Sequence, residues 1–159
     1  MFINTEVRPS TIFGKGLFTL EAVPRGKVVC FFALTGDVIT EAEYVQACER
    51  EDHFVMRTGT RYVGKYFTYS RQTAESNFLN HSFEPNLMVH CGIVIARRAI
   101  AAGEELSVDY RTLLDTSDVG LYHDAATGKE IRGFPSRETL LRTAKEFLDI
   151  VEDDQAWDG

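Results

Sequence analysis

The chain has 159 residues, of which 44% are hydrophobic and 26% charged, a composition that fits one globular domain and excludes disordered, collagen-like and coiled-coil chains. Its net charge of −7 is uneven, because residues 1–108 carry −1 and residues 109–159 carry −6. The acidic C-terminal third argues against duplex nucleic acid as the main ligand and suits either a basic partner or a solvated acidic helix.

The sequence contains no segment that predicts insertion into a membrane. Its longest apolar run covers residues 28–34, which is too short to span a bilayer, and the first residues show no signal-peptide pattern. The three cysteines, Cys30, Cys48 and Cys91, are widely spaced and form no CxxC pair. We interpret them as reduced thiols, with a redox role as the alternative, and we expect an intracellular, cytoplasmic protein that would be nuclear in a eukaryote.

Short runs of β-forming residues dominate the first two thirds of the chain. A capping box, Thr40 with Glu43, predicts a short helix over residues 41–50, and Cys91-Gly92 predicts a hairpin turn. Strands are predicted over residues 28–33, 53–57, 61–69, 87–90, 93–100 and 106–110. Because strands and helices do not alternate, we expect a mostly-β fold with few helices (α+β) rather than a parallel α/β sheet.

A helix is predicted at the C-terminal end, after a loop-rich stretch over residues 111–135. Ser136 follows Pro135 and is the expected N-cap. Apolar residues then recur at helical spacing and predict one buried face, made of Leu140, Leu141, Ala144, Phe147, Leu148 and Val151. We therefore expect residues 1–135 to form the body of the protein and residues 136–159 to pack on it as a helix, giving one domain overall.

Three motifs contain candidate functional residues. Gly14-Lys15-Gly16 lets the backbone approach a ligand closely, although a plain glycine turn is the simpler explanation. Residues 77–86 (NFLNHSFEPN) form a dense polar cluster between apolar strands, which either builds a turn or binds a ligand. Tyr110 ends a predicted strand, a position that more often serves packing. None of these motifs identifies a function when taken alone.

Taken together and in order, the segments GKGLF, FFALTGDVITEAE, NFLNHSFEPN and AIAAGEELSVDY resemble the SET-domain protein lysine methyltransferases. The resemblance covers residues 12–111, and NHS-x-x-PN followed by GEEL-x-x-DY is its most specific part. It implies a SET-type β-clip fold in which the NHS and tyrosine segments form a pseudoknot, followed here by a C-terminal helix. It also implies that S-adenosylmethionine binds on one face and that the target lysine enters a channel from the other.

The resemblance implies a role for individual residues. The catalytic residue is expected to be Tyr110, whose hydroxyl would orient the amine. The cofactor-binding residues are expected to be Gly14, Lys15, Gly16, Leu17, Asn77, Phe78, Asn80 and His81. A lysine amine must be neutral to accept a methyl group, and a dry channel beside a cationic sulfonium favours the neutral form.

Two departures from the family pattern concern the metal and the cofactor. Phe83 stands where many relatives carry a zinc-binding cysteine, and no cysteine follows Cys91, so we expect no metal. Asn77 stands where relatives often have an arginine near the cofactor carboxylate, a charge that Lys15 or Arg71 would have to supply.

Other departures concern the substrate channel, whose expected lining includes Leu34, Val108 and Phe134. Leu34 and Val108 stand where many relatives carry a tyrosine or another aromatic residue, so the channel should be wider, which favours multiple methylation or a degenerate site. Without a zinc-bound segment, an aromatic residue should close the channel. Phe134 is the first candidate, before Tyr122 and Trp157, and a plain core role is the alternative for each.

The leading hypothesis is methyl transfer from S-adenosyl-L-methionine to the side-chain amine of a lysine in a protein substrate. The expected partner is a basic protein, with no nucleic acid and no membrane, and the oligomeric state stays open, a homodimer being one alternative. A catalytically weak SET-like interaction module is the second hypothesis, favoured by Leu34 and Val108 and opposed by Tyr110, Asn80 and His81. A β-clip binding domain without cofactor is the third.

Overall fold

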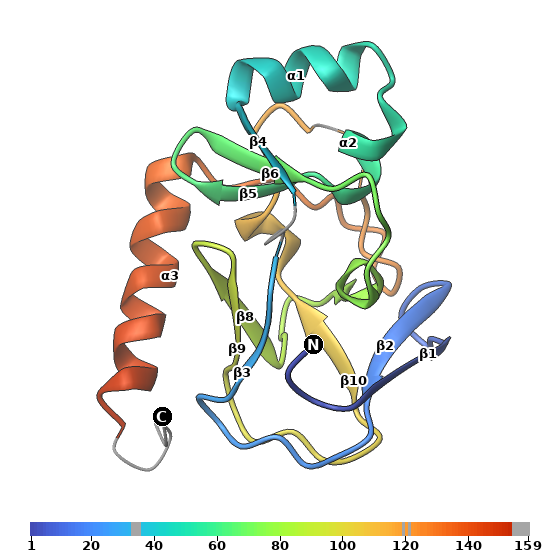
Figure 1. Cartoon of the computed structure of the whole chain (residues 1–159), viewed down its shortest axis with the longest axis vertical. Coiled ribbons are helices and arrows are strands. Elements are labelled where there is room, and N and C mark those ends of the chain that lie inside the picture. The colour runs from blue at the N-terminus through green and yellow to red at the C-terminus, as the bar shows by residue number, and fades with distance from the viewer. Residues whose placement is uncertain (33–35, 119, 121, 154–159) are drawn as a thin grey trace.

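A computed structural model of the chain describes residues 1–32, 36–118, 120 and 122–153. Within these residues the backbone forms three small sheets, three α-helices and two 3₁₀ turns, η1 (Glu75–Phe78) and η2 (Tyr110–Thr112) (Figure 1). Strands outnumber helices, and one helix lies at the C-terminal end, so the expected mostly-β SET-type fold is confirmed. No helix in the described ranges is both long and apolar enough to cross a membrane.

The largest sheet brings together the motifs that the sequence singled out. Its strands follow the order β1-β2-β10-β7 and have the bounds β1 (Thr5–Pro9), β2 (Lys15–Thr19), β10 (Glu105–Val108) and β7 (Asn80–His81). Strand β10 pairs antiparallel with β2 and parallel with β7. The parallel register sets Asn80 opposite Ser107 and His81 opposite Val108. The NHS segment and the segment that leads into Tyr110 therefore lie side by side.

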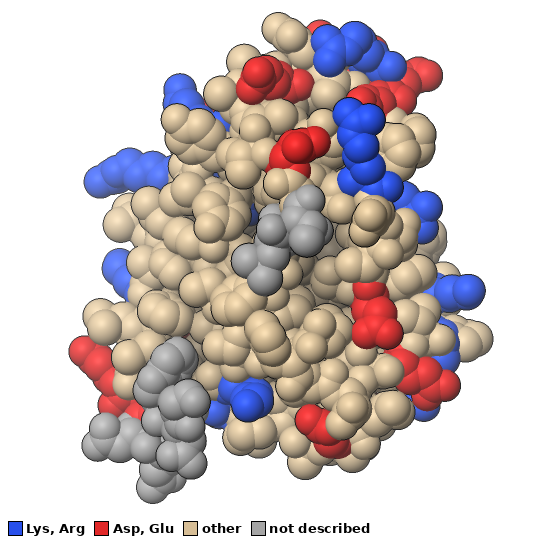
Figure 2. Space-filling view, in the orientation of Figure 1, with Lys and Arg blue, Asp and Glu red and all other residues tan. Residues whose placement is uncertain are grey.

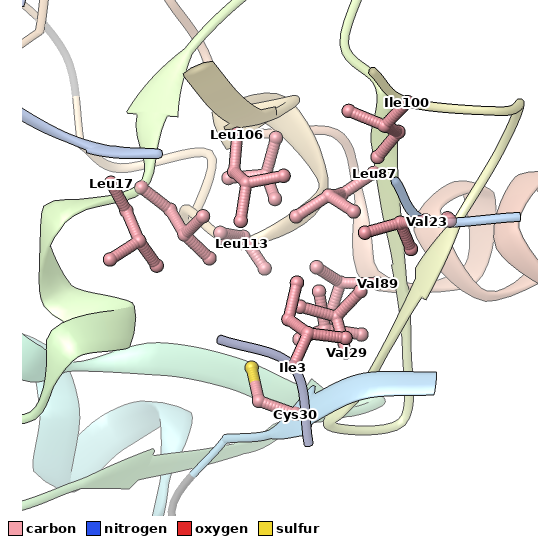
Figure 3. Close-up of a cluster of buried hydrophobic side chains, with 14 residues drawn as sticks. Ile3, Leu17, Val23, Val29, Cys30, Leu87, Val89, Ile100, Leu106 and Leu113 are labelled. Atoms are coloured by element: carbon pink, nitrogen blue, oxygen red, sulfur yellow. The ribbon is translucent and has the colours of Figure 1, made fainter. Parts of the chain in front are cut away.

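The second sheet carries much of the main core. Its order is β3-β9-β8, with β3 (Val28–Phe31), β9 (Ile93–Ala96) and β8 (Leu87–His90). The predicted hairpin is confirmed, since β8 and β9 pair across Cys91 and Gly92, whose φ angles are 48° and 78°. Fourteen buried residues, drawn in Figure 3, form one cluster that joins this sheet to β2 and β10. Leu17, Leu87 and Leu106 are completely buried there.

The third sheet and two short helices form the upper part of the molecule in Figure 1. The sheet has the order β4-β6-β5, with β4 (Asp37–Thr40), β6 (Tyr66–Tyr69) and β5 (Thr60–Val63). Helix α1 (Glu41–Glu49) begins at the predicted capping box, in which Thr40 and Glu43 bond to each other's backbone N–H groups. Helix α2 (His53–Thr58) follows directly.

The sequence-based assignment was wrong or incomplete around this sheet. Residues 53–57, predicted as a strand, form α2, because the carboxylate of Asp52 accepts the backbone N–H groups of Phe54 and Val55 and starts a helix. Residues 61–69, predicted as one strand, form β5 and β6 with a turn at Gly64, whose φ angle is 56°. Local capping and turn chemistry therefore override the β propensity of these residues.

Helix α3 (Ser136–Val151) lies along the second sheet, as Figure 1 shows. Its N-cap is Pro135 rather than Ser136, and no side chain caps it. Its buried residues are Thr139, Thr143 and Ile150, whereas the leucines of the predicted face are exposed: Leu140, Leu141 and Leu148. The prediction of the buried face was wrong for these leucines, whereas Phe147 packs against the small cluster of Met88, Ile95 and Ile150. Polar contacts also hold the helix in this rotation.

Two of these polar contacts involve the second sheet and the segment that follows it. The Thr143 hydroxyl lies 2.9 Å from Nδ1 of His90, on β8. Arg97, just after β9, forms an ion pair with Glu146 of α3. Together they turn the threonine side of α3 toward the body and leave the leucines in solvent.

Candidate active site

The side-chain amide of Asn80 fastens the glycine loop to the central sheet. Its Nδ2 atom lies 3.1 Å from the Ser10 hydroxyl, 3.1 Å from the Phe13 carbonyl, 3.2 Å from the Lys15 carbonyl and 2.8 Å from Oε1 of Glu105. An amide NH₂ has only two hydrogens, so these four acceptors share them. The NH₂ group of Asn80 is thus fully used inside the protein, where it ties residues 10–15 to Glu105.

The two glycines of the loop meet different requirements. A Cβ atom on Gly16 would collide with the carboxylate of Glu105, which hydrogen bonds from Ser10 and Asn80 hold in that place. Gly14 has a φ angle of 52°, and a Cβ atom there would meet nothing within 4 Å. Gly16 therefore serves internal packing, while Gly14 allows a left-handed turn whose outer side is open to a ligand. Sequence reasoning did not assign Ser10 or Glu105, although Glu105 belongs to the quoted GEEL segment.

His81 connects the NHS segment to the backbone of Tyr110. Its ring is buried, and Nδ1 accepts the backbone N–H of Tyr110 at 3.1 Å. Burial lowers the pKa of His81, against the opposing effects of the Asp109 and Asp124 carboxylates, so the neutral ring with its proton on Nε2 is favoured. Among the described residues, Nε2 has no hydrogen-bond partner. A buried donor without a partner is unusual and fits a place where a ligand completes the site.

A cavity of about 240 Å³ lies on the other side of Tyr110. The phenol oxygen of Tyr110 donates a hydrogen bond of 2.8 Å to the carbonyl of Leu79, which also lines the cavity. Burial raises the pKa of Tyr110 to about 12, so the hydroxyl keeps its proton at neutral pH. The ring of Tyr122 stands edge-on to the Tyr110 ring, with centroids 6.0 Å apart, and forms another part of the wall. The cavity can thus hold an apolar chain against a fixed hydroxyl.

The structure brings some of the predicted channel residues to this cavity and leaves others apart. Val108 lines it, and so does Asn77, which was predicted to bind the cofactor and whose Oδ1 accepts the backbone N–H of Ala74. Leu34 lies outside the described residues. Phe134 is not among the lining residues, whereas Tyr122 is. Of the three aromatic candidates for closing the channel, Tyr122 is therefore the one that lines the cavity, and Trp157 lies outside the described residues.

The predicted cofactor residues form a second group beside this cavity. Leu17 is completely buried, so only its backbone could contact a ligand, whereas Phe78 is partly buried and packs one side against the main core. Lys15 is exposed at the start of β2, next to Gly14. Asn80 and His81 lie on β7, and the glycine loop leads into β2. Because β7 and β2 flank β10 in one sheet, these two groups of predicted cofactor residues lie on either side of β10.

Aromatic and cationic side chains are stacked where relatives would carry a zinc cysteine. The guanidinium of Arg111 lies 4.9 Å from the ring centre of Phe83 and 5.0 Å from that of Phe134. Lys129 lies over Phe83 at 5.0 Å, and Arg142 of α3 lies over Phe134 at 4.5 Å. This stack links the tyrosine segment to α3. The described residues contain no group of three or more His, Cys, Asp or Glu side chains arranged to hold a metal ion.

A buried ion pair that the sequence did not reveal fixes the segment after Tyr110. Nη2 of Arg61, on β5, lies 2.5 Å from the carboxylate of Asp115, and both residues are less than 5% exposed. The backbone N–H of Arg61 donates to the carbonyl of Leu113. Because Leu113 and Leu114 line the cavity, this pair holds one wall of it against the third sheet.

A family model described as "SET domain" matches residues 14–111, and the chain therefore belongs to the SET domain family. The match covers the glycine loop, the NHS segment, Tyr110 and the part of the cavity wall that precedes it, whereas Leu113, Leu114 and Tyr122 of the wall lie beyond it. The parallel pairing of β7 with β10 and the position of Tyr110 beside the cavity agree with this membership.

Several curated relatives carry the name histone-lysine N-methyltransferase. The chain is 35% identical over 115 residues to SETMAR of Rattus norvegicus, a match that covers 61% of this chain and 36% of that protein. It is 32% identical over 126 residues to SUV39H1 of Xenopus laevis, covering 67% of this chain and 28% of that protein. It is 29% identical over 113 residues to the probable histone-lysine N-methyltransferase set-23 of Caenorhabditis briggsae, covering 61% and 46%. The chain thus matches less than half of the length of each of these relatives.

Proposed function

We propose that the protein transfers a methyl group from S-adenosylmethionine to the side-chain amine of a lysine in another protein. The observation that carries the proposal is the position of Tyr110 between the two halves of the site. Its backbone N–H bonds to His81 of the NHS segment, and its hydroxyl bonds to Leu79 in the wall of the cavity. Membership of the SET domain family and the names of the relatives support a methyltransferase.

The residues on the glycine-loop side fit a cofactor of this kind. The open outer side of Gly14 and the unpartnered Nε2 of His81 are both suited to a ligand rich in polar groups. The backbone of residues 14–16 and of Asn80 and His81 would hold S-adenosylmethionine, and Lys15 or Arg71 would meet its carboxylate. When bound, the cofactor supplies a methyl group on a positively charged sulfur.

The cavity side explains how the chain's own residues would prepare the amine. A free lysine has a pKa of about 10.4, so neutralising it at pH 7 costs roughly 4.6 kcal/mol in water. A wall made largely of apolar and aromatic residues, such as Leu79, Val108 and Tyr122, lowers that pKa by desolvation. The Tyr110 hydroxyl then orients the neutral amine. Holding reacting groups in line can contribute on the order of 7–11 kcal/mol to a displacement.

The width of the channel bears on the number of methyl groups added. Val108 presents a small side chain to the cavity, and the phenol of Tyr110 already donates its hydrogen bond to the backbone carbonyl of Leu79. The channel is therefore not narrowed by a large side chain at position 108, and the Tyr110 hydroxyl can meet the amine only as an acceptor. We propose multiple methylation of a basic, lysine-containing protein inside the cell, with no nucleic acid or membrane as partner.

A catalytically weak SET-like interaction module is the second candidate. The observation that favours it is the use of Asn80, whose side-chain NH₂ group bonds only to acceptors of the protein itself. In that case the glycine loop would be a structural element of a binding surface.

Methyl incorporation distinguishes the two candidates. Purified protein is incubated with tritiated S-adenosylmethionine and a lysate whose own methyltransferases have been heat-inactivated, and labelled proteins are identified by mass spectrometry. An enzyme should add 14 Da increments to lysine residues, and replacing the modified lysine by arginine should abolish labelling. Binding of the cofactor in calorimetry without any transfer would support the weak module instead.

A further inference from the structure

The cavity beside Tyr110 has an unusual charge pattern. Among the described residues that line it, Arg57 is the only charged one, and none is aspartate or glutamate. The other lining residues are apolar or aromatic, or carry hydroxyl, amide or thioether groups. In the view of Figure 2, charged side chains gather near the edges of the face, and its middle is largely uncharged.

Arg57 is free to meet a ligand. It lies in the last turn of α2, is exposed, and forms no ion pair with another described residue. Nearby carboxylates have other partners, since Asp52 caps α2, Glu75 accepts a hydrogen bond from a threonine of β1, and Asp115 pairs with Arg61. The guanidinium therefore stands uncompensated where the cavity meets solvent.

This charge pattern affects the substrate lysine and the residues next to it in the substrate chain differently. A wall without carboxylates offers no partner to an ammonium group, and a nearby guanidinium disfavours it further, so the amine enters more easily as the neutral form. Residues next to the lysine in the substrate chain stay near the mouth of the cavity. There an acidic side chain would pair with Arg57, and a basic one would be repelled.

We propose that Arg57 selects lysines that have an acidic residue next to them and disfavours lysines within basic runs. This inference rests on the proposed function and names the substrate sequence that its site prefers. It is compatible with a basic protein as the overall partner, because the net charge of −7 acts over the whole surface and is screened beyond roughly 8 Å at physiological salt. The selection by Arg57 concerns only the immediate neighbours of the lysine.

The test compares peptides that share one central lysine and differ only in the residues beside it, which are glutamate, glutamine or lysine. Wild type, Arg57→Met and Arg57→Glu are tested for kcat/KM of methyl transfer and, without cofactor, for peptide binding by fluorescence anisotropy. The matched control is Arg50→Met, which removes an exposed arginine at the end of α1 that does not line the cavity.

Wild type should prefer the glutamate peptide to the glutamine peptide by about twofold to fivefold, the range of an exposed ion pair. Arg57→Met should remove the preference, Arg57→Glu should invert it, and Arg50→Met should keep it. High salt should weaken it in wild type. The inference is overturned if Arg57→Met ranks the peptides as wild type does, or if Arg50→Met changes the ranking equally.

Failure of the proposed function looks different. If the folded protein binds S-adenosylmethionine but methylates no peptide or protein, the enzyme assignment is wrong. The anisotropy measurements still decide whether Arg57 prefers acidic neighbours, because they need no transfer.

Discussion

Arg61 and Asp115 form an ion pair of 2.5 Å although both side chains are almost completely excluded from solvent. Arg61 also donates from Nη1 to the carbonyl of Gly64 at 2.6 Å, and its guanidinium lies 4.6 Å from the ring centre of Phe67. A buried charge is costly unless every polar group around it is satisfied. This pair therefore joins the third sheet to the cavity wall, and breaking one side of it should be severe.

The first prediction concerns Asp115 and pH. Burial alone would raise the pKa of Asp115, but hydrogen bonds from Ser117 and Arg61 outweigh it and hold the pKa well below its usual value. A carboxyl group with a lowered pKa stabilises the folded state above its unfolded pKa of about 3.9, and that contribution is lost as the pH falls below this value. Asp115→Asn should cost on the order of 3–5 kcal/mol at pH 7.

The same variant should lose less of its remaining stability between pH 5 and pH 2 than wild type loses. Urea unfolding at a series of pH values measures both curves. Burial, and to a smaller extent the Asp115 carboxylate, raise the pKa of the neighbouring Asp118, whose effect runs in the opposite direction. The part due to burial is present in both proteins, and the part due to Asp115 is lost in the variant and only reduces the difference between the curves. Parallel curves for the two proteins would contradict the prediction.

The second prediction is that Tyr110→Phe lowers kcat without weakening cofactor binding. The ring remains as part of the wall, and only the hydroxyl is lost, which under the proposed function orients the amine. Removing one polar group that is oriented toward the transition state commonly lowers the rate by a factor on the order of 10²–10³. Single-turnover methyl transfer and cofactor calorimetry measure the two effects separately.

Tyr122→Phe is the matched control, since its hydroxyl makes only a long contact of 3.4 Å with the carbonyl of Met56. It should keep most of the activity. If Tyr110→Phe stays within threefold of wild type, Tyr110 is not the catalytic residue.

The third prediction is that Asn80 acts on the cofactor through the glycine loop. Asn80→Ala leaves the Glu105 carboxylate and the Phe13 and Lys15 carbonyls without their shared donor, which should cost about 1–3 kcal/mol of stability. Asn80→Asp should be worse, because it sets a second carboxylate beside Glu105. Both variants should bind S-adenosylmethionine more weakly than wild type in calorimetry. A cofactor affinity equal to that of wild type would remove Asn80 from the site.

The fourth prediction concerns the stack that joins Phe134 to α3. A cation–π contact of this kind contributes about 0.5–1 kcal/mol when partly exposed. A double-mutant cycle with Phe134→Leu and Arg142→Met should show a coupling of that size in urea unfolding. A second cycle on the ion pair of Arg142 with Glu138 provides a comparison for this coupling energy, since both of these side chains are largely exposed on the same helix. Strictly additive effects of the two changes would mean that the stack adds nothing to stability.

The fifth prediction is that chelators leave the protein intact. Phe83 lies in the stack where relatives would bind zinc, so incubation with EDTA should change neither the thermal unfolding temperature nor the methyl transfer rate. Elemental analysis of the purified protein gives an independent measurement. One equivalent of zinc per chain would contradict the prediction.

The parts of the fold that the sequence predicted well have local causes. The capping box at Thr40 and the glycine turn after Cys91 depend on a few neighbouring residues, and both are confirmed. The family resemblance predicted that the NHS and tyrosine segments meet, and β7 pairs with β10. Helix α2 does not follow from the β propensity of Phe54 and Val55, because it depends on the cap that Asp52 provides just before them.

What the sequence could not reveal depends on contacts between distant residues. The rotation of α3 follows from Thr143 meeting His90, and no periodicity in the helix itself contains that information. The need for glycine at position 16 follows from the carboxylate of Glu105, which is nearly ninety residues further along the chain. The roles of Asn80 and Glu105 therefore became visible only with the sheet in place.

The pairing of β7 with β10 has a consequence for how the protein folds. Strand β7 has only two residues and lies parallel to a strand that follows it by about twenty-five residues, so neither segment can hold the other through local turns. Closing such a loop loses chain entropy before it gains many contacts. The pairing should therefore form late, after the hairpin of β8 and β9. The site around Tyr110 would then assemble as one of the last steps of folding. Partly folded chains would therefore have the hydrophobic core but would lack the proposed active site.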